Sequence, residues 1–333
     1  MEGIDEEEKA LVLRESSDDD SNYLRFDSTE QEVEGDDGDE ESNQLSHLHN
    51  PEIPHVHVEF IDAYSFRALV EYLNLTNDDG NFIFTPKGVF YSRENDSKQV
   101  LNEFVLHAHE LTRFEYNSDK DKVISGLNMA QFKGSTKKIG KKDISRLSVF
   151  PSGVCLQVIG SPKSSSGDDM DLIRTQRLNH EFYTIDGYQS EDEPNFTESM
   201  QKFTSACSDQ ASCKDDFVTV IGLDHGIIME ARQGGNLRAS IKCLGQIDET
   251  NNIRSGNYSE KVARTSGKSL RIVVKHPSEV VRYRIPRRII SALSKLTNIS
   301  PNGTIKVYMQ PNLPIKLVFH ISTYGYLAIY LRG

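Results

Sequence analysis

The sequence lacks the long apolar segments and paired cysteines that mark membrane, secreted and many metal-binding proteins. Its 333 residues contain no run of 18 apolar residues and begin with an acidic stretch, so we expect neither a membrane span nor a signal peptide. The four cysteines form no C-x-x-C pair, and no histidine lies near them at the spacing of metal ligands. We therefore expect reduced thiols packed in a core.

Signatures of catalysis are also missing from the sequence. It has no G-x-x-x-x-G-K-[ST] loop, no dinucleotide-binding glycine pattern and no G-x-S-x-G elbow. Four histidines gather between His47 and His57, but two prolines separate them into pairs, which favours a linker that enters a first strand over a metal site. No nucleophile, base and orienting group are placed together. We predict no enzymatic activity, no metal and no cofactor.

Negative charge is concentrated at one end of the chain. The whole sequence has 38 Lys and Arg against 50 Asp and Glu, but residues 1–50 alone hold 18 acids and only three bases, Lys9, Arg14 and Arg25. The rest, with 35 bases and 32 acids, has a net charge of about +3. Like charges without an apolar period cannot bury enough surface to fold, so residues 1–54 are predicted to be a disordered acidic tail. The tail is interpreted as a solvated extension, with electrostatic regulation or partner docking as the alternative.

From residue 55 onward a helix followed by a β-rich segment recurs four times. Helices are expected at 62–75, 128–143, 195–209 and 286–298, the first because its apolar residues follow an i, i+3, i+4, i+7 spacing. Tight turns separate paired strands after the first three helices.

This order predicts an α+β fold with two tandem domains, each built from two helix-plus-strand repeats. The predicted boundaries are 55–170 for the first domain, 171–192 for a connector and 193–333 for the second domain. Residues 245–269 are expected to form a long polar loop inside the second domain.

Positive charge gathers on the predicted helices. Segment 128–143 has five lysines and no acid before Asp143, and an apolar stripe from Met129 to Ile139 would leave the lysines on the outer face. The candidate phosphate-contacting residues on the four helices are Arg67, Lys133, Lys137, Lys138, Lys141, Lys142, Lys202, Lys214, Arg287, Arg288 and Lys295. Clustered cations without interleaved aromatic residues favour sequence-independent contact with the backbone of duplex DNA. The alternative is an ordinary solvated surface with skewed charge.

Several stretches together resemble a known family. The final 23 residues, PNLPIKLVFHISTYGYLAIYLRG, are similar without gaps to the closing strands of sliding clamps of the proliferating cell nuclear antigen (PCNA) family, the DNA polymerase processivity factors. NMAQFKGSTKKIG resembles the family's second helix, GNFIFTPKGVFYSRE its first hairpin, and the segment that begins FTESMQKFTSAC the start of its second domain. The resemblance covers roughly residues 56–333 and depends on element order with few identities.

The resemblance implies an architecture and a set of partners. Three two-domain chains would form a closed ring with curved antiparallel sheets outside and twelve helices around the hole, where the cationic residues would face duplex DNA. Such a clamp is not an enzyme. It would tether DNA polymerase and other replication and repair factors with clamp-binding motifs, and a clamp loader would place it on DNA. The family implies a nuclear location, or a viral replication compartment for a divergent viral member.

The resemblance also implies two contact surfaces. Ring closure would pair the strand around DDMDLIRT with the strand NLRASIKCLG of the next chain, which places Leu172, Ile173, Ala239 and Ile241 at the subunit interface. The alternative for both strands is an internal sheet edge. The partner-binding pocket would comprise Pro314, Tyr330 and the connector residues Leu178, Phe182 and Ile185. For the connector aromatics the alternative is local packing.

Some features depart from the family pattern: the acidic tail, the long loop after Gly245, and the sparse basic residues on the first and third helices. They keep other functions open. The chain could be one subunit of a heterotrimeric checkpoint clamp or a monomeric processivity factor with a clamp fold. It could also be an interaction scaffold that recruits basic partners through its tail.

Overall fold

The structure is a computed structural model of the 333-residue chain. It describes residues 53–160, 169–175, 188, 192–232, 239–245, 262–265, 268–271 and 279–333. The chain divides into two compact units, residues 1–52 with 188–192, and residues 53–187 with 193–333. All the helices and strands reported below belong to the second unit. The predicted tail, apart from residues 53 and 54, and most of the predicted connector lie outside the described residues.

Helices and strands alternate along the second unit as the sequence predicts. The helices of the described residues are α2 Ala63–Thr76, η2 Ala108–Glu110, α3 Met129–Thr136, α4 Met200–Ala211, α6 Arg287–Leu293 and η3 Leu296–Asn298, where η marks a 3₁₀ helix. The strands of the first half are β1 Val56–Phe60, β2 Asp79–Thr85, β3 Gly88–Glu94, β4 Val100–His107, β5 Arg113–Tyr116, β6 Val123–Asn128, β7 Ile144–Phe150, β8 Gly153–Ile159 and β9 Asp169–Ile173. Those of the second half are β10 Phe196–Ser199, β11 Phe217–Leu223, β12 Gly226–Arg232, β13 Ala239–Gly245, β14 Val262–Thr265, β15 Lys268–Arg271, β16 Glu279–Pro286, β17 Thr304–Tyr308, β18 Ile315–Ile321 and β19 Gly325–Leu331.

The strands form antiparallel sheets that confirm the predicted α+β class. A five-stranded sheet has the order β5-β1-β7-β8-β9, and a four-stranded sheet has the order β13-β12-β11-β16. Between them an eight-stranded sheet, β10-β17-β18-β19-β4-β3-β2-β6, takes strands from both halves of the sequence. Its two halves meet where β19 pairs with β4, from Gly325 opposite Leu106 to Leu331 opposite Val100. The predicted domains therefore share one central sheet.

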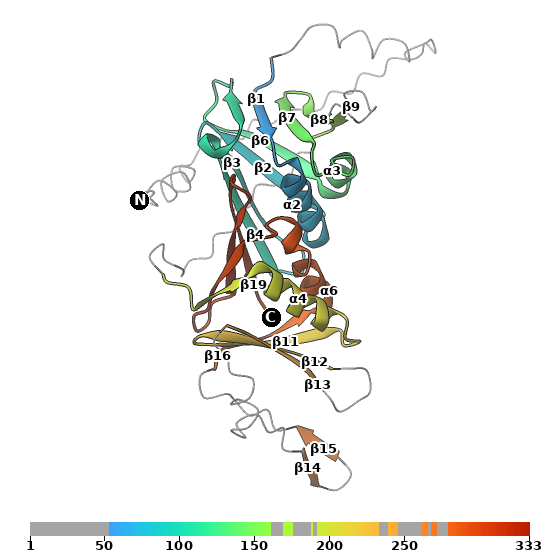
Figure 1. Ribbon diagram of the computed structural model, residues 1–333, viewed down its shortest axis with the longest axis vertical. Coiled ribbons are helices and arrows are strands. Elements are labelled where there is room, and N and C mark those ends of the chain that lie inside the picture. Colours follow the sequence, from blue (N-terminus) through green and yellow to red (C-terminus); the bar gives the residue numbers. More distant parts are fainter. Residues whose placement is uncertain are drawn as a thin grey trace, which may run out of the picture. The chain divides into compact units, whose positions relative to one another are not determined.

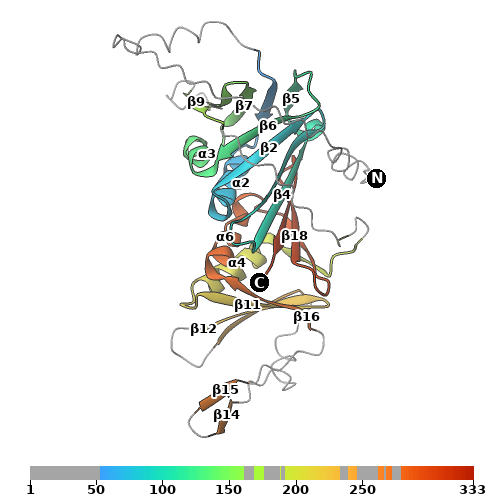
Figure 2. The same cartoon turned by 180° about the vertical axis from the view of Figure 1, so that it is seen from behind.

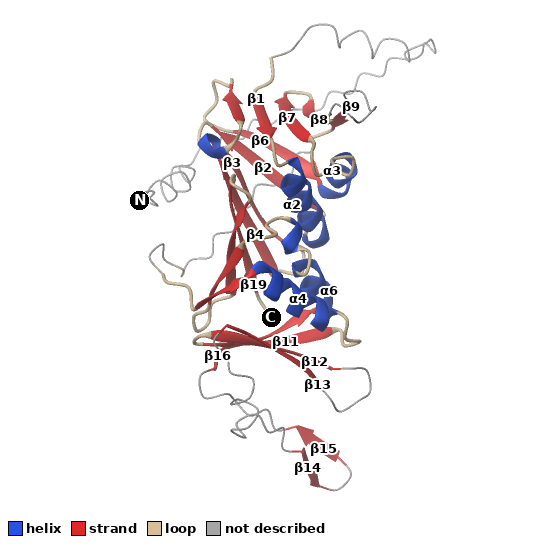
Figure 3. Ribbon diagram, in the orientation of Figure 1, coloured by secondary structure: helices blue, strands red, loops and turns tan. Residues whose placement is uncertain are grey.

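The four α-helices of the described residues lie on one side of these sheets, as Figures 1 and 2 show from opposite directions. Coloured by secondary structure, they form a single column of helix beside the strands (Figure 3). Helix α2 contacts α3 and α6, and α6 contacts α4, so the order in the column is α3, α2, α6, α4. We call these four helices, with the turns that follow α3, α4 and α6, the helix layer.

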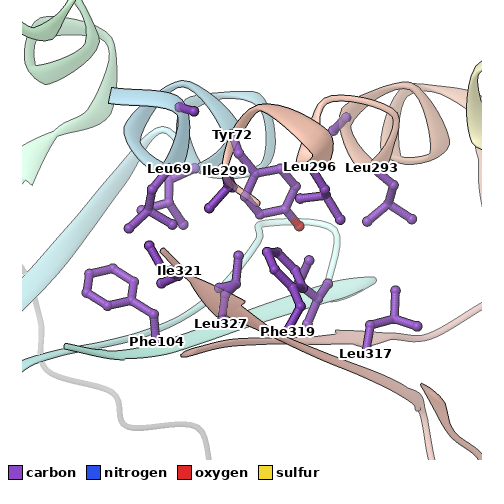
Figure 4. Close-up of a cluster of buried hydrophobic side chains, with 14 of the residues drawn as sticks. Leu69, Tyr72, Phe104, Leu293, Leu296, Ile299, Leu317, Phe319, Ile321 and Leu327 are labelled. Carbon is purple, nitrogen blue, oxygen red and sulfur yellow. The ribbon is translucent and has the colours of Figure 1, made fainter. Parts of the chain in front are cut away.

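The helices are held on the sheet by a continuous apolar core. Figure 4 shows its centre, where residues of α2 and α6 point toward the strands of the eight-stranded sheet. Leu69 and Leu73 of α2 and Leu293 of α6 are at most 1% exposed, and Leu327 of β19 is fully buried. Burying side chains of this size removes apolar surface from water at roughly 1.5–3 kcal/mol each. The core extends through both halves without a break.

Two glycines, at the starts of β3 and β19, allow the backbone of each strand to lie close to β4. Gly325 has φ +155°, and a Cβ there would lie 1.9 Å from the Val105 carbonyl oxygen. Gly88 has φ +144°, and its Cβ would lie 2.0 Å from the Leu106 carbonyl oxygen. Only glycine allows this backbone conformation together with such a close approach. The glycine before the last strand, part of the family resemblance, therefore has a steric role.

Three predicted helices have clearly different bounds in the structure. The prediction of 128–143 was too long, because α3 ends at Thr136 and residues 137–143 form turns on either side of Gly140. The prediction of 195–209 began too early, because residues 196–199 form β10, which pairs with β17. Helix α4 begins only after the Ser199 side chain caps it by accepting from the Lys202 amide. The segment 286–298 divides into α6 and η3.

Strands overlap two other predicted segments. Residues 171–173 lie in the predicted connector and also in the strand predicted around DDMDLIRT, and they belong to β9, where Ile173 pairs with Val154 and is fully buried. The long polar loop after Gly245 contains the hairpin β14–β15, in which Val262 pairs with Arg271. Cys155, Cys207 and Cys213 are buried free thiols and Cys243 is half-buried, as expected for core residues. In the described residues, no helix combines the length and hydrophobicity needed to cross a membrane.

Candidate nucleic-acid interface

The four helices of the helix layer carry few acids, although the turn after α4 adds Asp215 and Asp216 beside Lys214. Within the four helices the only acids are Glu71 of α2 and Asp209 of α4. Glu71 forms an ion pair of 2.8 Å with Arg67, and Asp209 forms one of 2.7 Å with Lys242. Both helical acids are thus already matched to a cation within the chain. The remaining cations give the layer a net positive face.

The strongest concentration of cations is a turn rather than a helix. We call residues 137–142 the basic turn, which contains Lys137, Lys138, Lys141 and Lys142, all exposed. The chain leaves α3 with the Lys137 amide donating to the Gly134 carbonyl and the Ile139 amide donating to that of Thr136. Ile139 is fully buried, which fixes the middle of the turn on the core while the lysines on both sides project away.

Further bonds hold the basic turn in this shape. The Gly140 amide donates to Asp143 Oδ2 at 2.7 Å, which closes the end of the turn. Arg67 of α2 donates to the Ile139 carbonyl at 2.8 Å and thus ties the turn to the neighbouring helix. Arg67 is therefore partly committed to the fold, since its side chain also pairs with Glu71. The sequence placed Arg67 among the phosphate contacts without this supporting role.

Sequence reasoning missed an aromatic residue in the helix layer. Tyr64 of α2 is half-buried, with the Arg67 guanidinium 5.9 Å and the Lys141 ammonium 5.7 Å from its ring centroid. Cations within about 6 Å of a ring are attracted to its face. The expectation that no aromatic is interleaved with the cations is therefore wrong for α2. The spacing of Tyr64 and Arg67, three residues apart on a helix, was the available signal.

Cations in the rest of the layer differ in how much they are engaged within the chain. Lys202 pairs with Glu198 at 2.7 Å, and Lys138 pairs more loosely with Asp171 at 3.5 Å. Exposed pairs of this kind contribute about 0–1 kcal/mol, so they leave the lysines available to a stronger anion.

The remaining cations of the layer reach backbone or hydroxyl groups, or solvent. Arg287 donates to the Cys213 carbonyl and Arg288 to Ser97 Oγ, each at 3.2 Å. Lys133 is half-buried, and Lys214 and Lys295 are exposed. All eleven candidate cations thus lie in one layer, and all of them are exposed except the half-buried Arg67 and Lys133.

Glu198 of β10 lies just before α4, and its neighbours favour the ionised form of its carboxyl group. Burial acts to raise the pKa of its carboxyl group, but hydrogen bonds from the Lys202 ammonium and from the Ser199 and Gly245 amides outweigh burial and lower that pKa. Its carboxylate therefore interacts with the Lys202 ammonium and with backbone amides. It adds little negative field to the exposed surface of the layer.

The strands predicted to close a ring are both sheet edges. Strand β9 ends the five-stranded sheet and β13 ends the four-stranded sheet. Among the side chains that the structure describes on these edges, the exposed large apolar ones are Leu172 at 60% and Ile241 at 40%. Ile173 is fully buried in its own chain, and the side chain of Ala239 lies outside the part that the structure describes. Leu172 and Ile241 are thus the candidate interface residues with accessible side chains.

The predicted partner pocket is only partly described. Pro314 and Tyr330 are both buried, and the Lys316 ammonium lies 5.7 Å from the Tyr330 ring centroid. Leu178, Phe182 and Ile185 of the connector fall outside the described residues. The pocket as a whole stays a prediction.

The histidines and carboxylates of the described residues form no group of three or more that could hold a metal ion. His57 instead bonds Ser148 Oγ through Nδ1 at 2.9 Å on the face of the five-stranded sheet. Its burial, together with the nearby Arg113 guanidinium, lowers the pKa of the imidazole. His47 and His49 lie outside the described residues.

Comparison with known proteins identifies the fold. No protein-family model matches the sequence, and no curated protein matches it either. The structure is similar to the crystal structure of the proliferating cellular nuclear antigen of Entamoeba histolytica, with a TM-score of 0.61 and 16% identity over 84% of this chain and 99% of that one. It is also similar to a chain of the PCNA2–PCNA3 complex of Sulfolobus tokodaii, with a TM-score of 0.60 and 17% identity over 83% of this chain and 98% of that one. The protein therefore has the fold of a PCNA-like sliding clamp.

Proposed function

We propose that the protein is a non-enzymatic, homotrimeric sliding clamp that encircles duplex DNA. The observation that carries this proposal is the helix layer, in which both helical acids are ion-paired while most of the cations project from the same face. A surface of this kind suits a ligand with dense negative charge. Duplex DNA, with one charge per about 1.7 Å of its axis, is such a ligand.

The chemistry of the layer favours sliding over fixed binding. Lysine ammonium groups on flexible stems contact phosphates as point charges and read no base sequence. Each contact releases condensed counterions and is individually weak, so the ring can move between neighbouring positions on the duplex. Processivity then depends on topology, because a closed ring cannot leave the DNA sideways.

Ring closure is assigned to the two open edges. An antiparallel pairing of β9 in one chain with β13 in the next would join the five-stranded sheet to the four-stranded sheet across the interface. Main-chain hydrogen bonds would supply the register, and Leu172 and Ile241 would be removed from water. Because the two edges differ, the contact is head-to-tail, which is the type that generates a closed ring.

The partners follow from this assignment. DNA polymerase and other replication or repair factors would bind through a short motif at Pro314, Tyr330 and the connector, and a clamp loader would open the ring. The protein would act in the nucleus, or in a viral replication compartment if a virus encodes it.

Two measurements test the proposal together. Light scattering gives the mass, and three 37.6 kDa chains amount to about 113 kDa, whereas a monomeric processivity factor would remain near 37.6 kDa. The protein is first mixed with linear duplex, so that a closed ring can thread over the free ends, and half of the sample is then circularised by ligation. Retention on the circle and on the linear DNA is compared after a high-salt wash that removes electrostatic binding. We expect retention on the circle only. A monomer, or equal loss from both DNAs, would contradict the ring, and a need for a second clamp subunit would favour the heterotrimer.

A further inference from the structure

The two sheet edges assigned to ring closure each carry a charged side chain on the side of the helix layer. On β9, Asp171 lies opposite the buried Leu156 of β8 and forms an ion pair of 3.5 Å with Lys138 of the basic turn. On β13, Lys242 forms an ion pair of 2.7 Å with Asp209 of α4. The two edges thus carry charges of opposite sign, and each charge is paired with the helix layer of its own chain.

The other face of each edge carries an exposed apolar side chain. Side chains alternate between the two faces of a strand, so Leu172 lies on the face of β9 away from Asp171, and Ile241 lies on the face of β13 away from Lys242. The two apolar side chains are 60% and 40% exposed. Both edges therefore combine a charge on the helix side with an apolar residue on the outer side.

These faces restrict how the two edges can pair, a step that rests on the proposed function because the ring sets all helix layers on one side. Directly opposed residues of an antiparallel pair project to the same face, so a shift by one residue would reverse the faces of one chain. Registers that preserve the faces differ by steps of two residues. The register that pairs Asp169 with Leu244 and Ile173 with Ser240 keeps all five residues of β9 opposite β13. A shift by two residues in either direction leaves one residue of β9 beyond the end of β13.

We infer that β9 pairs with β13 of a second copy of this chain in the register that brings both matching pairs together. Asp171 then lies opposite Lys242 of the partner subunit, and Leu172 lies opposite Ile241 of the partner subunit. The apolar pair is removed from water on the outer face, while the charged pair forms on the helix side. A shift by two residues loses both matches.

The charged pair extends two ion pairs that each chain already contains. Across the interface the charges alternate in sign in the order Lys138, Asp171, Lys242 of the partner subunit and Asp209 of the partner subunit. Ring closure therefore adds an attraction and breaks neither of the existing ion pairs. Such complementary charges fix the register of a contact and disfavour wrong pairings. They also connect the basic turn of one chain to α4 of the next.

Disulfide formation measures the register directly. Opposed residues have Cβ atoms about 4.5–5.5 Å apart, near the separation that a disulfide needs, whereas diagonal neighbours are about 7–8 Å apart. The full chain with L172C and I241C also carries C155A and C243A, because Cys155 lies opposite Leu172 within the chain and Cys243 lies on β13. Oxidation with copper phenanthroline should join this variant into covalent dimers and trimers.

The native Cys243 provides a matched control for a shifted register. It would lie opposite Leu172 of the neighbouring chain after a shift by two residues. The variant L172C/C155A keeps Cys243 and leaves Ile241 unchanged. We expect its yield of linked chains to be at least about fivefold lower, because the diagonal separation is too long for a disulfide.

Charge reversal tests the charged pair across the interface. D171K and K242D each place like charges at the contact, so the concentration at which the trimer dissociates should rise at least about tenfold at about 50 mM salt. D171K/K242D restores opposite charges there and should recover at least about half of the loss on the logarithmic scale, since repulsion within each chain remains. E115K and R113E make the same changes of charge on β5, the other edge of the five-stranded sheet, and should leave assembly unchanged. A double variant no better than either single variant would contradict the charged pair.

The outcomes separate this inference from the proposed function. If the protein is a trimer and L172C/C155A links better than the variant with L172C and I241C, the ring stands and the register is wrong. If a trimer forms no links in either variant and tolerates both charge reversals, the ring again stands, but its subunits meet elsewhere and the inference is wrong. A protein that stays a monomer in light scattering and forms no links contradicts both.

Discussion

The guanidinium of Arg67 in α2 donates a hydrogen bond of 2.8 Å to the backbone carbonyl of Ile139, 72 residues later in the chain. Its Nε simultaneously donates to Glu71 Oε1 at 2.8 Å. The same side chain that adds charge to the helix layer therefore also positions the basic turn. The effect of Arg67 on stability can therefore be measured separately from the contribution of the layer's cations to DNA binding.

Replacing Arg67 with methionine tests the positioning role. The change keeps an unbranched apolar side chain but leaves the Ile139 carbonyl without its donor. We expect a decrease of about 1 kcal/mol in the free energy of unfolding, in the range of a partly exposed charged hydrogen bond. Hydrogen exchange should accelerate at residues 137–143 more than elsewhere. The matched change Lys295→Met removes an exposed cation and should leave both properties unchanged; equal exchange in the two variants would exclude the positioning role.

Removing cations from the layer should weaken DNA binding without unfolding the protein. The triple variant K133Q/K214Q/K295Q takes one cation from each of three places in the layer, none with an acidic partner among the described residues. For each phosphate that the variant no longer neutralises, the slope of log K against log salt should fall by about 0.9. The expected total decrease is therefore between about 2 and 3 if all three lysines contact phosphates.

The control for this experiment uses lysines outside the layer. Lys120 and Lys306 are exposed on the loop before β6 and on β17, and K120Q/K306Q changes the net charge by a comparable amount. Its salt slope should remain that of the parent protein. A parallel decrease in both variants would mean that DNA responds only to net charge, and the helix layer would have no special role.

The sequence was sufficient for the order of elements because periodicity and turn residues are local properties. The apolar spacing of Phe66, Leu69, Val70 and Leu73 identified α2 within one residue at each end. Hairpins such as β2–β3 and β11–β12 formed where proline or glycine punctuated apolar runs. These signals depend on residues within about ten positions of each other, so a single sequence contains them.

The errors arose where distant residues decide the local structure. Residues 196–199 read as the start of a helix, but pairing with β17, more than 100 residues later, draws them into a strand. The basic turn was predicted as helix because Ile139 continues the apolar stripe that begins at Met129, whereas Arg67 and Asp143 stabilise the turn instead. For the candidate site, the sequence identified the cations but could not show that Arg67 is engaged or that Tyr64 lies between them.

The buried Asn102 predicts a stability effect at the centre of the fold. Asn102 is fully buried on β4, where its Oδ1 accepts from the Tyr72 hydroxyl at 3.0 Å and its Nδ2 donates to Thr76 and Asn77 at 2.9 and 2.8 Å. Asn102→Ala should lower the free energy of unfolding by about 3 kcal/mol, because several buried polar groups are left without partners. Tyr72→Phe leaves only one acceptor unpaired and should cost about 1–2 kcal/mol in a urea titration. Equal costs would contradict a network centred on Asn102.

Histidine burial predicts a decrease of stability in mild acid. Burial and the nearby Arg113 guanidinium lower the pKa of His57 below its ordinary value of 6.5. The folded state thus binds the proton less well than the unfolded state, so this contribution is complete above about pH 6.5 and disappears as the pH falls through the folded-state pKa. The free energy of unfolding should decrease as the pH falls below about 6.5, with a shallower decrease in His57→Gln. Identical pH profiles would show that His57 does not contribute.

Substitutions on the edge strands β9 and β13 should prevent assembly of the ring without unfolding the single chain. Leu172 on β9 and Ile241 on β13 are exposed in the single chain, so an aspartate at either position should change the free energy of unfolding of the monomer by no more than about 0.5 kcal/mol. In a ring the same side chain would be buried at an interface, where an unpaired carboxylate is costly. Light scattering of L172D and I241D should therefore show the mass of one chain, near 37.6 kDa, where the parent shows about three times that value.

Leu75→Asp provides the control, because Leu75 is 51% exposed at the end of α2 and lies on neither edge. If all three variants assemble as the parent does, β9 and β13 are ordinary sheet edges and the subunits meet elsewhere. If L75D dissociates as well, the decrease in mass reflects general destabilisation, and the edges are not identified as the interface.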